Sequence, residues 1–228
     1  MDIAIIPARG GSKRIPRKNI KLFKGKPMIY WSINAAYNSN CFEKIIVSTD
    51  DNEIADIAKE YGAEVPFKRP SHLADDYSNT IDVIKHSLSW MQKSDLKVKR
   101  ICCIYATAPL INFKDISKAR TILDLSEEDF VVFTATSYPF PIQRAISIDS
   151  DGYSKMFYPN NYKTRSQDLI QSFHDAGQFY WASKSIWENT NNLFENSKPF
   201  IIPRWRVQDI DNHEDWERAE IIHDLINK

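Results

Sequence analysis

Short runs of apolar residues alternate along the chain with longer segments in which apolar residues recur every three or four positions. The short runs predict strands over residues 3–7, 44–49, 100–105, 129–135 and 199–202. The periodic segments predict helices over residues 28–38, 51–61, 80–91, 115–125 and 212–226, with helical turns between 183 and 195. This alternation favours a mostly parallel sheet with helices on both faces, in which ligands bind at the carboxyl ends of the strands.

Residues 137–180 interrupt this rhythm, because they hold several prolines and many aromatic residues but no helical period. We therefore expect a β-rich insertion within a single domain that spans residues 1–228. With 43% hydrophobic residues, the chain can bury one large core. No apolar run approaches the roughly 20 residues that cross a bilayer, and the start lacks the basic region of a signal peptide. Three cysteines form neither a disulfide framework nor zinc spacing, so we expect a cytoplasmic protein.

The 30 basic and 30 acidic side chains cancel, which argues against binding to nucleic acid or to a membrane surface. Their distribution is uneven, however. Residues 9–26 hold eight lysines and arginines and no acid, whereas residues 209–224 hold seven acids and one arginine. The chain therefore begins cationic and ends acidic.

The basic stretch begins directly after the first predicted strand and contains the adjacent Gly10 and Gly11. Adjacent glycines allow backbone amides to approach an anion closely, and the cations around them neutralise its charge. The spacing is that of neither a Walker A loop nor a dinucleotide-binding Gly-x-Gly-x-x-Gly loop. On these grounds the segment is either a phosphate-binding loop or a solvated turn.

The same loop matches the pattern Ala-Arg-x-x-Ser-Lys-x-x-x-x-Lys-Asn at every fixed position. The matching residues are Ala8, Arg9, Ser12, Lys13, Lys18 and Asn19. In this the chain resembles the sugar-activating nucleotidyltransferases, specifically the cytidylyltransferases of nine-carbon acidic sugars. The resemblance implies a Rossmann-like, GT-A-like α/β fold and CTP as a substrate. It implies that Arg9, Lys13 and Lys18 hold the phosphates, and that the nucleotide is also contacted by Ala8, Gly10, Gly11, Ser12 and Asn19.

Two further segments resemble nucleotide-contacting parts of this family. Arg69-Pro70 and Asn79-Thr80 match its Arg-Pro and Thr positions, which implies that Arg69, Asn79 and Thr80 contact nucleotide. The alternatives are an ordinary surface arginine and a threonine that caps the following helix.

The acidic end contains Asp209 and Asp211, which are two residues apart on an extended segment and so point to the same face. They resemble the Asp-Ile-Asp motif that precedes the last helix in this family. Mg²⁺ takes few carboxylates together with substrate phosphates, so the pair is a candidate magnesium site. Asp211 and Glu214 also have the spacing of a capping box for the final helix.

Some segments separate this chain from the N-acetylneuraminate enzymes. Tyr105 and Ile111 stand where those enzymes have glutamine and arginine, and residues 139–144, 164–169 and 175–181 are similar to the branch of the family that activates pseudaminate. Pseudaminate is an acidic sugar with two acylamino groups and a terminal methyl. The resemblance nominates as sugar contacts Arg165 for the carboxylate, Arg144, Gln167, Gln178 for the acylamino groups, and Tyr180. Core or subunit packing is the alternative for the aromatic residues.

The resemblance implies transfer of CMP from CTP to pseudaminate with release of pyrophosphate, for the biosynthesis of glycans, by an Mg²⁺-dependent homodimer that exchanges the 137–180 insertion. We assign no general base. The alternatives are another acidic sugar (N-acetylneuraminate, legionaminate or Kdo), a nucleic-acid-binding module, or a regulator that binds nucleotide without turnover.

Overall fold

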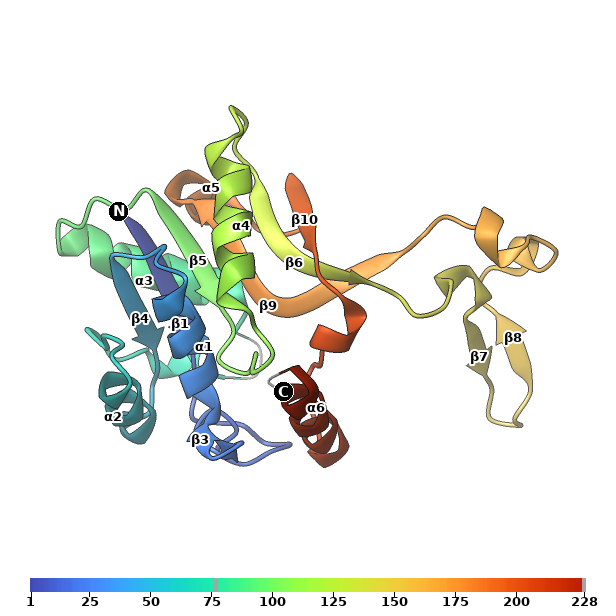
Figure 1. Cartoon of the computed structure of the whole chain (residues 1–228), viewed down its shortest axis with the longest axis horizontal. Coiled ribbons are helices and arrows are strands. Elements are labelled where there is room, and N and C mark those ends of the chain that lie inside the picture. Colours follow the sequence, from blue (N-terminus) through green and yellow to red (C-terminus); the bar gives the residue numbers. More distant parts are fainter. Residues whose placement is uncertain (76–77, 227–228) are drawn as a thin grey trace.

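The centre of the protein is a six-stranded sheet, seen in a computed structural model that describes residues 1–75 and 78–226 (Figure 1). Its strand order is β10-β6-β9-β5-β1-β4. The strands are β1 (Asp2–Pro7), β4 (Lys44–Ser48), β5 (Arg100–Ile104), β6 (Val131–Ser137), β9 (Phe173–Ser183) and β10 (Ser197–Ile201). All neighbours are parallel except β9, which is antiparallel to both β5 and β6. The mostly parallel sheet expected from the sequence is thereby confirmed.

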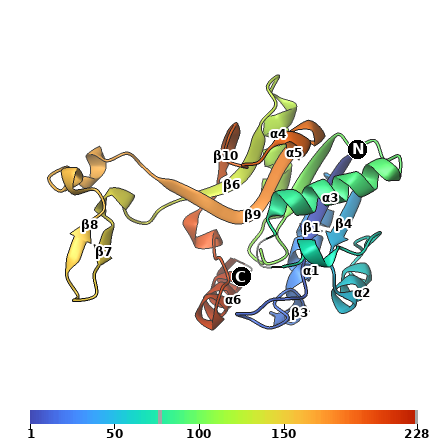
Figure 2. The same ribbon diagram turned by 180° about the vertical axis from the view of Figure 1, so that it is seen from behind.

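Helices cover both faces of the sheet, because the central strands are apolar on both sides. In β1, Ala4 and Ile6 pack into one core layer and Ile3 and Ile5 into the other, and all four are fully buried. α1 (Met28–Asn38), α2 (Asn52–Glu60) and α4 (Phe113–Asp124) lie on the first side, and α3 (Thr80–Lys93) and α5 (Lys184–Asn189) on the second (Figure 2). In the described part of the chain, no helix is long and apolar enough to cross a membrane.

The carboxyl ends of the parallel strands face the last helix, α6 (His213–Ile226), and the small hairpin formed by β2 (Leu22–Phe23) and β3 (Lys26–Pro27) (Figure 1). Phe23 and Trp216 pack edge to face with ring centroids 5.6 Å apart, which fixes α6 against the loop that follows β1. The segment that follows β1 and the last helix therefore meet at the edge of the sheet where ligands bind in such folds.

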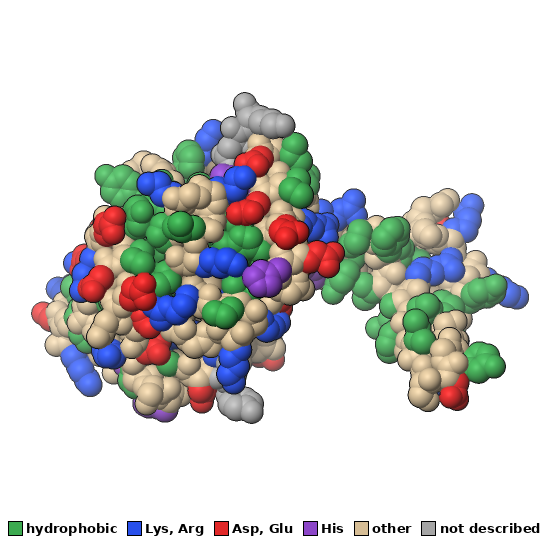
Figure 3. All heavy atoms as spheres, turned by 90° about the horizontal axis from the view of Figure 1, so that it is seen from below, with side chains coloured by type: hydrophobic (Ala, Val, Ile, Leu, Met, Phe, Trp, Pro, Cys, Tyr) green, Lys and Arg blue, Asp and Glu red, His purple; other side chains and the backbone are tan. Residues whose placement is uncertain are grey.

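An arm projects from the body between β6 and β9 (Figure 1). It holds a two-stranded sheet, β7 (Ile146–Ile148) and β8 (Ser154–Met156), and short 3₁₀ turns. Strand β9 begins at Phe173 and runs to Ser183, so the last residues of the expected 137–180 insertion belong to the central sheet. Figure 3 shows hydrophobic side chains gathered on the arm. Its large exposed apolar residues include Phe140, Ile148, Tyr153, Phe157, Tyr162 and Ile170.

A buried ion pair ties the segment before α6 to the body. Arg206 Nη1 lies 2.6 Å from Asp115 Oδ2, and the side chains are 11% and 9% exposed. We expect Asp115→Ala to lower the free energy of unfolding by about 3–5 kcal/mol, because it leaves the buried guanidinium without a counter-ion. Denaturant unfolding measures this. The matched control is Asp56→Ala, which removes an exposed pair with Lys59 and should cost less than about 1 kcal/mol. Equal losses would contradict this role of the buried pair.

Candidate active site

A cavity of about 350 Å³ opens at the carboxyl ends of β1 and β5. Pro7 ends β1, and Tyr105, Ala106 and Thr107 follow β5, so strand ends form part of its wall. Most of the expected phosphate and nucleotide residues line the same cavity. They are Arg9, Ser12, Lys13, Lys18, Asn19, Arg69, Asn79 and Thr80. Of the remaining expected residues, Ala8 is fully buried beneath the loop.

The loop between β1 and the β2–β3 hairpin is held in shape by contacts from its own residues. Gly10 N donates to Asp50 Oδ1 at 3.0 Å, and a Cβ at Gly10 would lie only 2.9 Å from Asp51 Oδ2. Gly11 has open space around its Cα. Asn19, which is 6% exposed, donates from Nδ2 to the Arg9 carbonyl at 2.9 Å. A larger residue at position 10 would therefore have to displace the Asp51 side chain, and Asn19 supports the loop backbone.

Lys18 joins the basic loop to the acidic end of the chain. Its Nζ donates to the carbonyl of Ile210, 192 residues later, at 2.5 Å and lies 3.9 Å from Asp211 Oδ1. Arg14 Nη1 approaches Asp211 Oδ2 to 2.6 Å. Burial lowers the pKa of Lys18 in spite of the nearby carboxylates. The cationic and acidic clusters of the sequence thus meet beside this cavity.

The two aspartates are close enough to influence each other. Burial, and next the Asp211 carboxylate, raise the pKa of Asp209. Asp209 lines a neighbouring cavity, whereas Asp211 contacts Lys18 and Arg14, which line the first one. The pair therefore stands between the two cavities.

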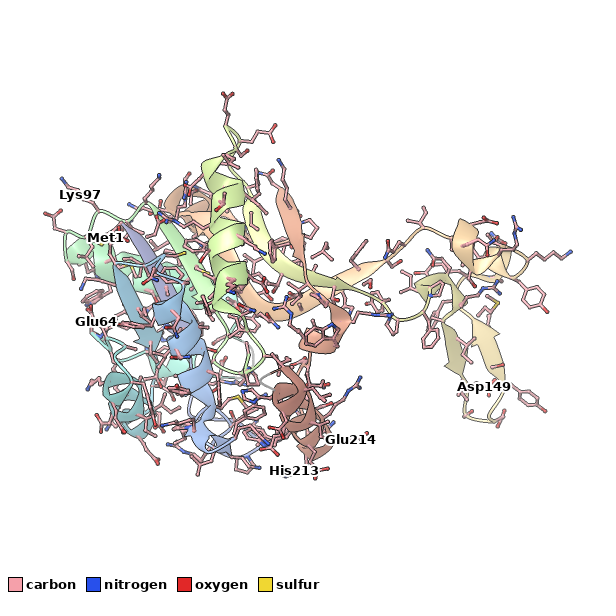
Figure 4. All side chains as sticks on the ribbon, viewed as in Figure 1. Met1, Glu64, Lys97, Asp149, His213 and Glu214 are labelled. Atoms are coloured by element: carbon pink, nitrogen blue, oxygen red, sulfur yellow. The ribbon has the colours of Figure 1, made fainter. Side chains whose placement is uncertain are left out.

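The cap of the final helix differs from the one expected. Asn212 Oδ1 accepts from Asp215 N at 2.9 Å, and Asp215 Oδ2 accepts from the amides of Asp211 and Asn212 at 3.0 and 3.1 Å. The capping box is thus one residue later than Asp211–Glu214, and Glu214 lies exposed at the start of α6 (Figure 4). Capping leaves the Asp211 carboxylate available for other contacts.

Arg69 is no ordinary surface arginine, since it is only 4% exposed. Its guanidinium donates to the hydroxyl and the carbonyl of Ser48, and burial lowers its pKa to about 10. The helix cap expected at Thr80 is made by Asn79, whose Oδ1 accepts from Asp82 N at 2.9 Å. The Thr80 hydroxyl instead lies 3.0 Å from the Tyr105 hydroxyl, at the cavity wall.

A second cavity of about 450 Å³ adjoins the first and shares Tyr105 and Thr107 with it. Its other walls come from β9, from the segment before α6, and from α6 itself. These lining residues are His174, Asp175, Ala176, Gly177, Val207, Gln208, Asp209 and Arg218. The two cavities together can hold two substrates side by side, with the acidic pair between them.

The expected sugar contacts lie elsewhere in the single chain. Arg144, Arg165 and Gln167 are on the arm, where Arg144 donates to the carbonyls of Tyr162 and Thr164 and Arg165 pairs with Asp168 at 3.0 Å.

Gln178 and Tyr180 are buried in β9, at 3% and 1% exposure. The Gln178 amide donates to the Arg206 carbonyl at 2.8 Å, while the Tyr180 hydroxyl donates to Asp175. None of the five lines either cavity, and their contact with sugar stays a prediction.

Several cavity residues were absent from the expected site: Arg14, Thr107, His174, Asp175, Gln208 and Arg218. The position of Thr107 just after β5 was a usable signal, because ligands gather at strand ends in such sheets. Asp175 and Arg218 carry no comparable signal, since only the folded chain brings β9 and α6 together.

A mostly parallel α/β sheet with a basic, glycine-containing loop after its first strand and two aspartates beside that loop is an arrangement suited to nucleotidyl transfer. A family model described as "Cytidylyltransferase" matches residues 3–150. The chain belongs to this cytidylyltransferase family.

Relatives match over nearly the full length. The chain is 43% identical to a pseudaminic acid cytidylyltransferase of Campylobacter jejuni over 97% of this chain and 96% of the relative. It is 34% identical to a CMP-N,N'-diacetyllegionaminic acid synthase of Legionella pneumophila over 98% and 96%. A solved CMP:2-keto-3-deoxy-manno-octonic acid synthetase, complexed with CTP, has the same fold with a TM-score of 0.74, 16% identity and 99% of both chains covered.

Proposed function

We propose that this cytidylyltransferase transfers CMP from CTP to pseudaminate and releases pyrophosphate. The observation that carries the proposal is the pair of adjoining cavities with Lys18 on the wall of one and Asp209 on the wall of the other. The names of two relatives that share 43% and 42% identity with the chain support the choice of pseudaminate. The product would be an activated sugar for a glycan.

In this reaction the anomeric oxygen of the sugar bonds to the α-phosphorus of CTP, and the bond from that phosphorus to the bridging oxygen of pyrophosphate breaks. The hydroxyl proton passes to solvent. Arg9, Lys13 and Lys18 line the first cavity and would stabilise the negative charge on the departing phosphates. The second cavity holds the sugar beside the α-phosphate.

The acidic pair fits a magnesium ion. Mg²⁺ takes few carboxylates and completes its coordination with substrate phosphates and water, so two aspartates beside the first cavity suit it. Burial, and next the repulsion from Asp211, raise the pKa of Asp209, and a cation held by both carboxylates would offset that repulsion. When bound, Mg²⁺ would supply charge stabilisation at the phosphates. Asp209 and Asp211 would hold it.

The arm supports a homodimer in which each arm reaches the site of the other subunit. Its exposed apolar residues include Phe140 at 79% and Ile148 at 69% exposure, and contiguous apolar surface of this kind marks an interface. Such an arrangement would bring Arg144, Arg165 and Gln167 to the partner's second cavity. We further infer that the enzyme acts in the cytoplasm, since its three cysteines are buried free thiols.

We expect Ile148→Asp to convert the dimer to a monomer, because a charge in an apolar interface is left without a partner. Light scattering after size-exclusion chromatography gives the mass. Leu125→Asp, at an 83% exposed leucine on the body, is the matched control and should leave the dimer intact. A wild-type monomer would contradict the proposal.

Mixing two inactive variants tests whether the arms are exchanged. Lys18→Ala dimers mixed with Arg165→Ala dimers should recover about a quarter of wild-type turnover, because half of the dimers then have one intact site. If each arm completes the site of its own subunit, every site carries one of the two substitutions and no activity returns.

The substrate is tested by pyrophosphate release from CTP with pseudaminate, legionaminate, N-acetylneuraminate and Kdo in turn. We expect pseudaminate to have the highest kcat/KM of the four sugars. Turnover of N-acetylneuraminate at the same rate would overturn the choice of sugar but not the nucleotidyl transfer.

A further inference from the structure

Asp175 is an acid of the second cavity with no role in the reaction described above. It lies in β9, opposite Ala135 of β6, where the chain returns from the arm to the body. It is partly buried and lines the second cavity together with Asp209 and Arg218. Its carboxylate forms no ion pair with any of the described residues, although Arg218 lines the same cavity.

The orientation of this carboxylate is fixed by two donors from its own strand. Gly177 N donates to Asp175 Oδ1 at 2.9 Å, and the Tyr180 hydroxyl donates to Oδ2. Gly177 has a φ of +60°, a conformation that favours glycine and lets the strand bend around the carboxylate. An ionised carboxylate has about four lone-pair positions. Two of them stay available after these bonds.

The hydroxyl of Tyr180 donates its hydrogen bond to Asp175. The tyrosine is 1% exposed, and burial raises the pKa of its hydroxyl far above the usual range, so it stays a donor. Its ring lies 5.2 Å from that of Tyr105, whose hydroxyl bonds to Thr80 in the wall of the first cavity. Tyr180 therefore lies between Asp175 and Tyr105, a residue that both cavities share.

Because the Asp175 carboxylate is held in one orientation, it favours a ligand that places a hydrogen-bond donor against it. The carboxylate of Asp175 only accepts hydrogen bonds, and an acylamino N–H only donates. A sugar that places an acceptor or an apolar group there would leave the remaining lone pairs of this partly buried carboxylate without a donor, at a cost that disfavours that sugar. A sugar with more acylamino groups has more ways to meet this requirement.

We propose that Asp175 is a specificity-determining residue that accepts a hydrogen bond from an acylamino N–H of the sugar, with Tyr180 as its positioning residue. This inference rests on the proposed function, because it assigns the second cavity to the sugar. It assigns no role to Asp175 in binding CTP.

The test measures kcat and KM for both substrates in Asp175→Asn and Tyr180→Phe. In the first variant, an NH₂ group that faces the Gly177 amide would meet a donor, and one that faces Tyr180 would force that hydroxyl to accept instead of donate. We expect the sugar KM to rise by about tenfold to a hundredfold while the CTP KM changes by less than about twofold. Tyr180→Phe should raise the sugar KM by about tenfold, and the double variant should be no worse than Asp175→Asn.

Asp129→Asn is the matched control, because Asp129 accepts from the Ser183 hydroxyl at 2.6 Å at the other end of β9. The Asp129→Asn variant should have the same KM values for CTP and for the sugar as the wild type. The preference for pseudaminate over N-acetylneuraminate, which carries fewer acylamino groups, should fall in Asp175→Asn.

An unchanged sugar KM in Asp175→Asn, or an equal rise in the CTP and sugar KM values, would overturn the role of Asp175. Tyr180→Phe keeps the ring and decides the same question if Asp175→Asn does not fold. A wild-type enzyme that rejects pseudaminate but accepts another acylamino sugar would overturn the proposed substrate alone. The KM of that accepted sugar in the two variants would then decide the role of Asp175.

Discussion

Lys18→Ala should lose at least two orders of magnitude in kcat, about 2.7 kcal/mol of transition-state stabilisation. The ammonium lies at the wall of the first cavity and is largely buried, with its side chain 18% exposed. The charge of this ammonium is already in position before the reaction begins. It acts strongly on phosphate oxygens, because little water screens it. Pyrophosphate release at saturating CTP and sugar measures the loss.

Lys24→Ala is the matched control for this experiment. Lys24 belongs to the same basic stretch, but it lies in the turn between β2 and β3, outside the lining of the first cavity, and its Nζ pairs with Asp224 at 2.7 Å. We expect its kcat to stay within about twofold of the wild type, since a surface ion pair contributes little. Near-normal turnover of Lys18→Ala, in a variant with an unchanged melting temperature, would remove Lys18 from the catalytic groups.

Asp211→Ala should likewise lose at least two orders of magnitude in turnover. The substitution removes one of two carboxylates proposed to hold the metal, and it also releases Arg14 and Lys18 from their partner. Turnover is measured across a magnesium titration. Binding of Mn²⁺ to the enzyme with CTP, followed by electron paramagnetic resonance, reports on the site without depending on catalysis.

Glu214→Gln supplies the comparison for this second experiment. Glu214 is an exposed acid three residues from Asp211, and the cap of α6 does not use it. Its Mn²⁺ affinity and turnover should match those of the wild type. If Asp211→Ala binds Mn²⁺ as tightly as Glu214→Gln does, the acidic pair is not the metal site.

Most helices and strands were predictable because their buried apolar residues recur at a regular spacing along the sequence. Ile81, Ile84, Leu88 and Met91 recur at helical spacing, and all four are buried on α3. The boundaries of β9 were not predictable in this way. Its second half is buried on both faces, with Phe179 and Trp181 in one core layer and Tyr180 and Ala182 in the other, so the period of two disappears there.

The basic loop and the acidic pair were predictable because their chemistry is concentrated in short segments. The cap of α6 was not, since Asp211–Glu214 and Asn212–Asp215 have the same spacing and only the folded backbone chooses between them. Asp175 was not predictable either. Its role depends on Tyr180 and Gly177, which turn it toward a cavity that β9 and α6 form together.

The most direct test of nucleotidyl transfer follows the α-phosphate. The enzyme is incubated with CTP labelled at that phosphorus, Mg²⁺ and pseudaminate, and the labelled products are separated and weighed by mass spectrometry. We expect the label to enter a CMP-sugar only when the sugar is present, and one pyrophosphate to appear for each CMP-sugar formed. Label that stays in CTP, or that is released as CMP without the sugar, would contradict this expectation.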